Sequence, residues 1–276
     1  MTPKIATLIL AGGKNKDEMR AACGGITNRA MVPLNGMPML EYVVAAVRGG
    51  ASATNGGRIL VAGDVPTPIG CVAVEGGLSM IDTLYAGVDA LKSDETRLLV
   101  VTSDIPFLTA DALMDFAARA TALGPEVDFA YPIIPAQACA TRFPTMRRTT
   151  LRIAEGRFTG GNLALLDPEF LRRNDALLRD AYARRKSIIG LARLLGPETI
   201  FRLLASRAVP AFLTIRNVEE AVGRALGGVN VRAVVTDYAE IGADVDKPED
   251  LEIAERTLLA RPSPVPSVDV RLGKRL

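Results

Sequence analysis

Two aspartates stand where a carboxylate could act on a phosphate group. Asp104 follows the apolar run LLVVTS and precedes the dipeptide IP, so we expect it at the carboxyl end of a central strand. Asp246 lies just before Pro248 and is the candidate for a second carboxylate at the same place, with Asp244 as the alternative. Mg²⁺ prefers oxygen ligands and takes one or two carboxylates together with substrate phosphates. Asp104 and Asp246 are therefore candidate Mg²⁺ ligands; the alternatives are a turn or cap residue at 104 and a polar helix entry at 246.

The first strand-like run breaks into a glycine turn, TLILAGGKNKDEM at residues 7–19. Gly12 and Gly13 let the backbone approach an anion closely and point amide groups at it, while Lys14 and Lys16 add positive charge. The alternative is that AGG is only a tight exit from the strand. Neither the GxGxxG fingerprint nor the spacing of a P-loop occurs here, so a phosphate site at this turn would be of another kind.

The chain contains no histidine, which excludes Ser-His-Asp and Cys-His nucleophiles and most catalytic zinc sites. Its three cysteines, Cys23, Cys71 and Cys139, are far apart and form no CxxC pair. We interpret them as small apolar residues rather than a disulfide framework or a thiolate zinc site. Any chemistry must then rest on carboxylates, Lys and Arg, hydroxyls, backbone amides or a hard metal ion.

Alternating strand-like and helix-like segments must position these residues. The alternation predicts an α/β fold with a mostly parallel sheet and helices on both faces. Strand-like runs lie near 5–10, 58–63, 71–74, 97–101, 127–131 and 231–235, and helical periods lie near 38–48, 79–92 and 109–122.

The second half of the chain has a different secondary-structure pattern. Residues 168–226 carry a nearly continuous helical signal, broken at Gly196 and Pro210, and a last helix starts at Pro248. We predict one domain over residues 1–260, with a helical insertion at about 168–226, followed by a proline-rich tail over 261–276.

Composition limits the partners. No apolar stretch approaches the ~18 residues that span a bilayer, and the N-terminus enters a strand without a signal-peptide core, so we expect a cytoplasmic protein with no membrane partner. A net charge of +2 gives no reason to expect a nucleic-acid partner. Residues 172–207 hold nine Lys and Arg against three acidic residues. We interpret this stretch as a solvated helix face; a clamp for an acidic acceptor by Arg184, Arg185 and Lys186, or a nucleic-acid surface, is the alternative.

Four motifs in order resemble the MobA-like nucleotidyltransferases, the group that includes molybdenum-cofactor guanylyltransferases and sugar-phosphate nucleotidylyltransferases. They are LILAGG at 8–13, NRAMVPLNGMPML at 28–40, SDIPFLT at 103–109 and DVDKPEDL at 244–251, and FTGGNLALLDPE at 158–169 is similar to a less-studied branch. The resemblance implies a Rossmann-like three-layer sandwich of nucleotide-diphospho-sugar transferase type. It also implies Mg²⁺-dependent transfer of NMP from an NTP to a phosphorylated small-molecule acceptor, with release of pyrophosphate.

The resemblance assigns roles to named residues. Arg29, Lys14 and Asp104 would be catalytic, and Asp104 and Asp246 would hold Mg²⁺. Gly160, Gly161 and Asn162 would bind the acceptor, and a hairpin turn is the alternative. The nucleotide would bind at Leu10, Ala11, Gly12, Gly13, Gly77 and Thr83. For the GGLSMIDTL loop at 76–84 there is a competing explanation, because Ser79 and Asp82 have the spacing of a helix capping box.

Three departures from the family pattern motivate a second hypothesis. Asn15 and Asp17 stand where the pattern has glycine and arginine, and Arg29 stands where it has lysine. Arg29 keeps the cation but is not equivalent to lysine. The alternative function is a nucleotide or sugar-nucleotide binding protein that keeps the fold without turnover. The sequence leaves the base, the acceptor and the oligomeric state open.

Overall fold

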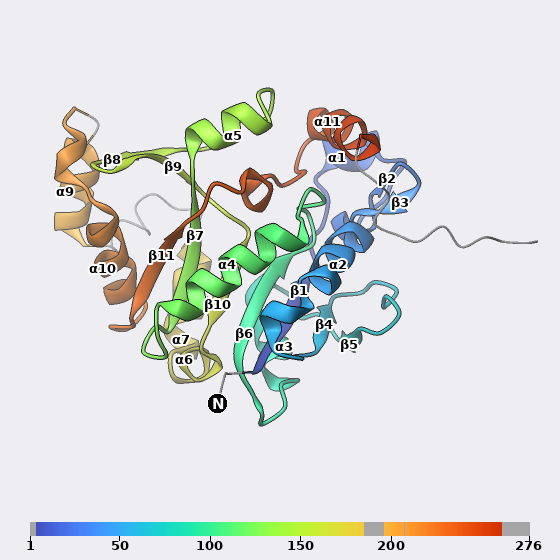
Figure 1. Ribbon diagram of the computed structural model, residues 1–276, viewed down its shortest axis with the longest axis horizontal. Helices are drawn as coiled ribbons and strands as arrows, with labels where there is room; N and C mark the ends of the chain where they lie inside the picture. The colour runs from blue at the N-terminus through green and yellow to red at the C-terminus, as the bar shows by residue number, and fades with distance from the viewer. Residues whose placement is uncertain (1–3, 185–195, 207, 261–276) are drawn as a thin grey trace, which may run out of the picture.

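A nine-stranded mixed sheet forms the centre of the computed structural model, which describes residues 4–184, 196–206 and 208–260 (Figure 1). The predicted tail at 261–276 lies outside these described residues. The strands are β1 (Lys4–Leu10), β4 (Ile59–Ala62), β5 (Val72–Val74), β6 (Glu95–Thr102), β7 (Phe129–Pro135), β8 (Leu151–Ile153), β9 (Gly156–Gly160), β10 (Leu163–Leu166) and β11 (Val231–Val235). A separate two-stranded sheet pairs β2 (Pro33–Leu34) with β3 (Met37–Pro38).

The strand order in the large sheet is β5-β4-β1-β6-β10-β7-β9-β8, and β11 pairs with β7. The pairs of β1 with β4 and β6, of β4 with β5, and of β7 with β11 are parallel. Strand β10 is antiparallel to both β6 and β7, and β9 is antiparallel to both β7 and β8. All strands except β9 and β10 therefore point the same way, which is the mostly parallel sheet that the sequence predicts.

Helices cover both faces of the sheet and complete three layers (Figure 1). They are α1 (Asp17–Ala22), α2 (Met39–Gly49), α3 (Met80–Asp89), α4 (Ala110–Ala122), α5 (Ala136–Arg142), α6 (Pro168–Arg173), α7 (Asp175–Arg184), α9 (Pro197–Ala205), α10 (Ile215–Ala225) and α11 (Pro248–Leu259). The helix expected at Pro248 is α11, with proline in its first turn. None of the described helices is long and apolar enough to cross a bilayer.

The two cores follow from the two-residue period of the strands. In β1, Ile5 and Ile9 point into the core that includes residues of α2 and α4, whereas Ala6 and Leu8 point into the core that includes residues of α3 and α6. Strand β6 alternates in the same way across LLVV. Because both faces of these strands are buried, the central strands read as continuous apolar runs, and the polar residues that follow them mark the edge of the sheet.

A buried ion pair anchors the opposite edge, where β6 begins. The carboxylate of Glu95 accepts hydrogen bonds from Nε of Arg58 at 2.9 Å and from the backbone amide of Lys92 at 2.9 Å. Burial alone would raise the pKa of Glu95, but these donors outweigh it and lower the pKa from 4.5 to about 2.

This pair predicts a pH-dependent stability. Because the pKa is lower in the folded state, the contribution of Glu95 is complete above pH ~5 and is lost as the pH falls towards 2; a shift of this size corresponds to about 3 kcal/mol. Urea unfolding of Glu95→Gln should show a loss of about that size at pH 7, which shrinks as the pH is lowered. Glu252→Gln, on the exposed face of α11, is the control. A gap between Glu95→Gln and wild type that is equal at pH 7 and pH 3 would contradict this account.

Candidate functional site

One edge of the sheet collects the residues that the sequence assigns to the nucleotide, acceptor and metal sites. Strands β1 and β6 end there side by side, with the amide of Ser103 donating to the carbonyl of Leu10 at 3.3 Å. Because β10 is antiparallel to β6, it begins at the edge where β6 ends, and the amide of Thr102 donates to the carbonyl of Asn162 at 3.2 Å. Loops that are distant in sequence therefore meet at this edge, where ligands bind in open α/β sheets.

A cleft of about 600 Å³ opens beside the first loop. The predicted nucleotide-binding residues line it, with the exception of Ala11, which is fully buried and donates its amide to Ala62 at 2.7 Å. Tyr182 of α7 also lines the cleft, and no motif in the sequence pointed to it. The lining residues that the sequence had assigned are Leu10, Gly12, Gly13, Lys14, Arg29, Gly77, Thr83 and Asp104.

The glycines of the first loop are not required by packing. A Cβ atom at Gly12 would lie 3.8 Å from Oγ1 of Thr83, and one at Gly13 would lie 3.8 Å from Cβ of Arg29, both ordinary contact distances. Packing instead requires glycine at Gly63, where φ is +151° and a Cβ would lie 2.6 Å from the carbonyl of Ala11. A side chain at 12 or 13 would thus meet no clash, and both glycines line the cleft.

The unusual residues of this loop have structural roles. The side-chain amide of Asn15 donates to the carbonyl of Ile26 at 2.9 Å and so ties the two arms of the loop together. Asp17 opens α1, where an acidic residue suits the helix dipole, and it pairs with Arg20 at 2.9 Å on the surface. Neither residue lines the cleft of about 600 Å³. We call this cleft the nucleotide-side cleft, after the predicted nucleotide-binding residues in its lining.

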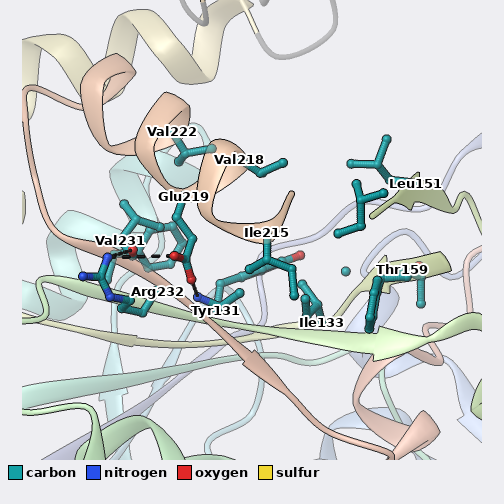
Figure 2. A pocket seen from close by; sticks show the side chains of 15 residues that line it. Tyr131, Ile133, Leu151, Thr159, Ile215, Val218, Glu219, Val222, Val231 and Arg232 are labelled. Atoms are coloured by element: carbon teal, nitrogen blue, oxygen red, sulfur yellow. Dashed lines mark hydrogen bonds and ion pairs between the residues drawn. The ribbon is translucent and has the colours of Figure 1, made fainter. Parts of the chain in front are cut away.

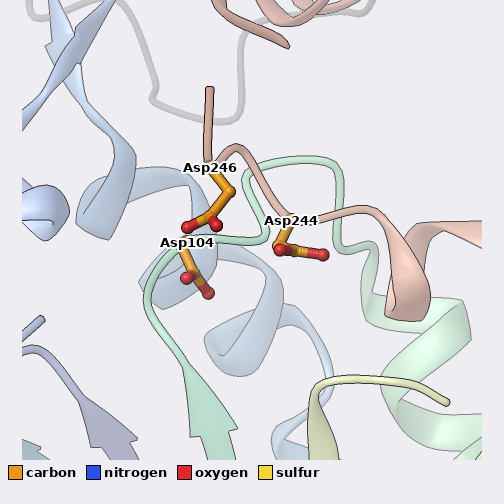
Figure 3. Close-up of side chains that lie close together, drawn as sticks. All are labelled: Asp104, Asp244 and Asp246. Atoms are coloured by element: carbon orange, nitrogen blue, oxygen red, sulfur yellow. The ribbon is translucent and has the colours of Figure 1, made fainter. Parts of the chain in front are cut away.

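Three carboxylates converge at the end of β6 (Figure 3). Asp104, Asp244 and Asp246 each present an oxygen within 4.8 Å of the others. Asp244 and Asp246 flank the buried Val245, whose amide donates to the carbonyl of Asp104 at 2.8 Å. Sequence reasoning treated Asp244 only as an alternative to Asp246, whereas the structure brings both aspartates to Asp104. The D-V-D pattern, with one aspartate on each side of a buried valine, was the signal in the sequence that both could be used.

Two guanidinium groups balance this acidic cluster. Nη1 of Arg29 donates to Oδ2 of Asp104 at 2.9 Å and also forms an ion pair with Asp246. Arg148 pairs with the carboxylate of Asp244 and donates to its carbonyl at 3.2 Å. Burial raises the pKa of Asp104 above its ordinary value, and the charge of Asp244 adds to this, whereas the hydroxyl of Thr102 and the guanidinium of Arg29 oppose it.

The cluster fits a hard divalent cation. Oδ1 of Asp104 and Nε of Arg29 are both buried, and neither atom has a hydrogen-bond partner among the described residues. Buried polar atoms are normally satisfied, so an unpaired carboxylate oxygen favours a bound cation and an unpaired donor favours a bound anion. Carboxylate oxygens are the ligands that Mg²⁺ prefers.

A second cleft, of about 800 Å³, lies on the other side of the cluster. It is lined by the predicted acceptor residues Gly160, Gly161 and Asn162, together with Asp244 and Asp246, and we call it the acceptor-side cleft. Gly160 ends β9, and Gly161 and Asn162 join it to β10. Strands β9 and β10 do not pair with each other, so the alternative of a hairpin turn is wrong. Packing accounts for the glycines, because a Cβ would lie 2.5 Å from the hydroxyl of Tyr131 at 160 and 2.6 Å from Cγ2 of Ile241 at 161.

The loop before α3 has the capping box that its spacing predicts, between Ser79 and Asp82. Oγ1 of Thr83 accepts from the amide of Gly77 at 3.1 Å and donates to the carbonyl of Ser79 at 3.0 Å. A Cβ at Gly77 would lie 2.2 Å from Cβ of Asp82. Gly77 and Thr83 therefore have structural roles and also line the nucleotide-side cleft.

Arginines of the basic stretch are paired with acids where the structure describes them. Arg172 pairs with Glu169, Arg179 with Asp175 at 2.7 Å, and Arg202 with Glu198 at 2.9 Å. Of the candidate clamp, Arg185 and Lys186 lie outside the described residues, as does the side chain of Arg184.

Comparisons with known proteins relate the chain to a family and to a fold. A family model described as the MobA-like NTP transferase domain matches residues 7–194. A solved structure described as a hypothetical transferase from Thermus thermophilus is 37% identical, covers 91% of this chain and 100% of its own, and has a TM-score of 0.73. None of the curated proteins compared with the chain matches it.

Two further solved structures share the fold at lower identity. A CMP:2-keto-3-deoxy-manno-octonic acid synthetase complexed with CTP is 13% identical, with a TM-score of 0.57 over 93% of this chain and 98% of its own. A nucleotidyl transferase from Methanothermobacter thermautotrophicus is 15% identical, with a TM-score of 0.54 over 94% and 99%.

Proposed function

The chain belongs to the MobA-like NTP transferase family, and from this premise we propose that it transfers a nucleotidyl group from an NTP to a phosphorylated small-molecule acceptor and releases pyrophosphate. The observation that carries the proposal is the acidic cluster between two clefts. Asp104 lines the nucleotide-side cleft, and Asp244 and Asp246 line the other. An NTP and an acceptor in these clefts would meet at the three carboxylates.

The nucleotide side supplies positive charge and bare backbone. Gly12 and Gly13 present amide groups to the triphosphate, and Lys14 reaches it from the same loop. Arg29 lies where charge develops on the departing pyrophosphate, and its unpaired Nε is a donor that a phosphate oxygen can satisfy. The base then lies towards Gly77 and Thr83.

The reaction needs positioning more than acid-base chemistry. An oxygen of the acceptor phosphate attacks the α-phosphorus in line, the new O–P bond forms, and the bond from the α-phosphorus to the bridging oxygen breaks with its electrons on pyrophosphate. The attacking oxygen is already anionic, so no general base is required, in keeping with a chain that lacks histidine. Asp104 and Asp246, with Asp244 beside them, would hold Mg²⁺, which neutralises phosphate charge in such transfers.

The proposal is tested by pyrophosphate release. The protein is incubated with each of the four NTPs, Mg²⁺ and a pool of phosphorylated metabolites, and NTP binding is measured separately by thermal shift. We expect one NTP to stabilise the protein and to yield pyrophosphate only when the pool is present. No stabilisation by any NTP would overturn the proposal.

A binding protein without turnover is the second candidate, and one observation favours it. Arg29 bridges Asp104 and Asp246, so a cation of the chain itself already neutralises two of the candidate metal ligands. Stabilisation by an NTP without pyrophosphate from any acceptor pool would support this candidate over the enzyme.

Substitution of Gly12 should change the KM for the NTP without changing the free energy of unfolding. Gly12→Ala should leave the free energy of unfolding within about 0.5 kcal/mol of wild type, because its Cβ meets only an ordinary contact. The added methyl group would hold the triphosphate away from the loop, so we expect the KM for the NTP to rise roughly tenfold, or about 1.4 kcal/mol. Urea unfolding and steady-state kinetics measure the two effects. An unchanged KM in the folded variant would remove Gly12 from the nucleotide site.

A further inference from the structure

An apolar pocket of about 350 Å³ lies between α10 and the strands β7, β9 and β11 (Figure 2). Ile215, Val218 and Val222 line it from the helix, and Ile133 and Val231 line it from the sheet. Its volume is within the ~300–1,000 Å³ of small-molecule sites. It is more than twice that of a ~150 Å³ cavity that admits benzene.

Polar contacts at the start and in the middle of α10 tie this helix to neighbouring segments. The carboxylate of Glu155 accepts from the amide of Ile215 at 3.1 Å at the start of the helix. One turn later, Glu219 accepts from the amide of Ala233 at 2.7 Å and lies 3.9 Å from Arg232. These contacts fix the helix relative to the strands. An apolar space beside a helix that is fixed in this way is suited to an apolar ligand.

The pocket shares part of its lining with the cleft of about 800 Å³ beside the acidic cluster, the acceptor-side cleft. Tyr131, Thr159 and Gly160 line both spaces. The hydroxyl of Tyr131 donates to the carbonyl of Gly161 at 2.7 Å, in the middle of the predicted acceptor segment. Burial raises the pKa of Tyr131, so this hydroxyl remains protonated and keeps its donor role. Tyr131 and Gly160 therefore form a wall that separates the acceptor-side cleft from the apolar surface of the pocket.

The charges in the pocket indicate what kind of group it takes. Glu219 and Arg232, its charged lining residues, face each other at one end, and Thr159 lies towards the other end (Figure 2). Their charges offset each other, so the pocket favours a neutral occupant.

We propose that this pocket binds the apolar part of the acceptor, so that the acceptor is an amphipathic phosphate monoester with a neutral aliphatic or aromatic tail. The phosphate lies at the acidic cluster, and the tail passes Tyr131 and Gly160 into the space beneath α10. This inference rests on the acceptor side of the proposed function.

A series of alkyl phosphates tests the proposal on the wild-type protein. Binding of inorganic phosphate, ethyl phosphate, butyl phosphate and hexyl phosphate is measured by calorimetry in the presence of Mg²⁺. Each methylene group that enters the pocket should tighten binding by up to about fourfold. Inorganic phosphate should compete with hexyl phosphate, because one site holds the head group. Affinity that does not change with chain length would overturn the proposal.

Matched variants locate the tail. Val218→Phe and Val222→Phe each fill the pocket from α10, so both should lose at least tenfold in affinity for hexyl phosphate while inorganic phosphate binds as before. Val235→Phe places the same side chain on the exposed end of β11, outside the lining, and should change neither. A chain-length gain that survives in both pocket variants would place the tail elsewhere and contradict the proposal.

The outcomes separate this inference from the proposed function. Chain-length-dependent binding without pyrophosphate release from any NTP would support the pocket and count against the enzyme. Pyrophosphate release with a fully polar acceptor, together with alkyl phosphates that gain nothing from their chains, would support the enzyme and overturn the pocket.

Discussion

Replacing Asp104 with asparagine is expected to lower kcat by about 10³-fold while the protein stays folded. The change keeps the shape of the side chain but removes a charge from the group where three carboxylates converge. A metal ion supplies several kcal/mol of charge stabilisation in a transition state, and each ~1.4 kcal/mol corresponds to a factor of ten. Asp246→Asn should cause a similar loss.

The double variant identifies how the two residues act. If Asp104 and Asp246 hold one ion, Asp104→Asn combined with Asp246→Asn should be little worse than either single variant, since residues that act as a unit do not add. Mn²⁺ binding in the presence of the NTP, followed by electron paramagnetic resonance, should weaken in all three. Asp111→Asn, on the exposed start of α4, is the control and should behave as wild type. Losses that multiply in the double variant would show that the two carboxylates act separately.

Arg29→Ala should have two effects of opposite sign. Turnover should fall by about 10²-fold or more, because a donor aimed at developing charge is worth roughly that factor. In the absence of nucleotide, however, Mn²⁺ should bind more tightly, because the guanidinium that contacts Asp104 at 2.9 Å and pairs with Asp246 is gone. Arg29→Lys should keep part of the turnover, since the positive charge remains.

The control for Arg29 is a second arginine, in the nearby helix α1. Arg20→Ala removes an arginine of α1 that pairs only with the exposed Asp17 among the described ion pairs, and it should leave kcat and Mn²⁺ binding unchanged. Wild-type turnover in folded Arg29→Ala would remove this residue from the mechanism. Unchanged Mn²⁺ affinity in Arg29→Ala would mean that the guanidinium does not compete for the carboxylates.

The central strands and the position of Asp104 could be read from the sequence. An apolar run such as LLVV is long enough to be a buried strand, and the first polar residues after it must leave the sheet at its carboxyl edge. The same reasoning placed Gly12 and Gly13 at that edge after β1. These features depend on local burial, which composition and period reveal directly.

The acceptor side was harder to predict. The run LALL at 163–166 is too short to reveal its direction, and nothing in its period says that β10 lies antiparallel between β6 and β7. That reversed strand brings Asn162 to the edge where Asp104 lies. The direction of a strand depends on which neighbours it pairs with, and pairing is a property of the whole sheet.

By itself, the sequence determined the chemistry that is available: carboxylates, arginines and bare glycine backbone, with no histidine, on a three-layer α/β scaffold. Only the tertiary structure decided how these groups combine. It placed Asp244 with Asp104 and Asp246, set Arg29 between two of these carboxylates, and put Tyr131 in the lining of both the apolar pocket and the acceptor-side cleft. The reason is physical: residue type and burial pattern act locally, whereas ion pairs and cavities arise between segments that only the folded sheet brings together.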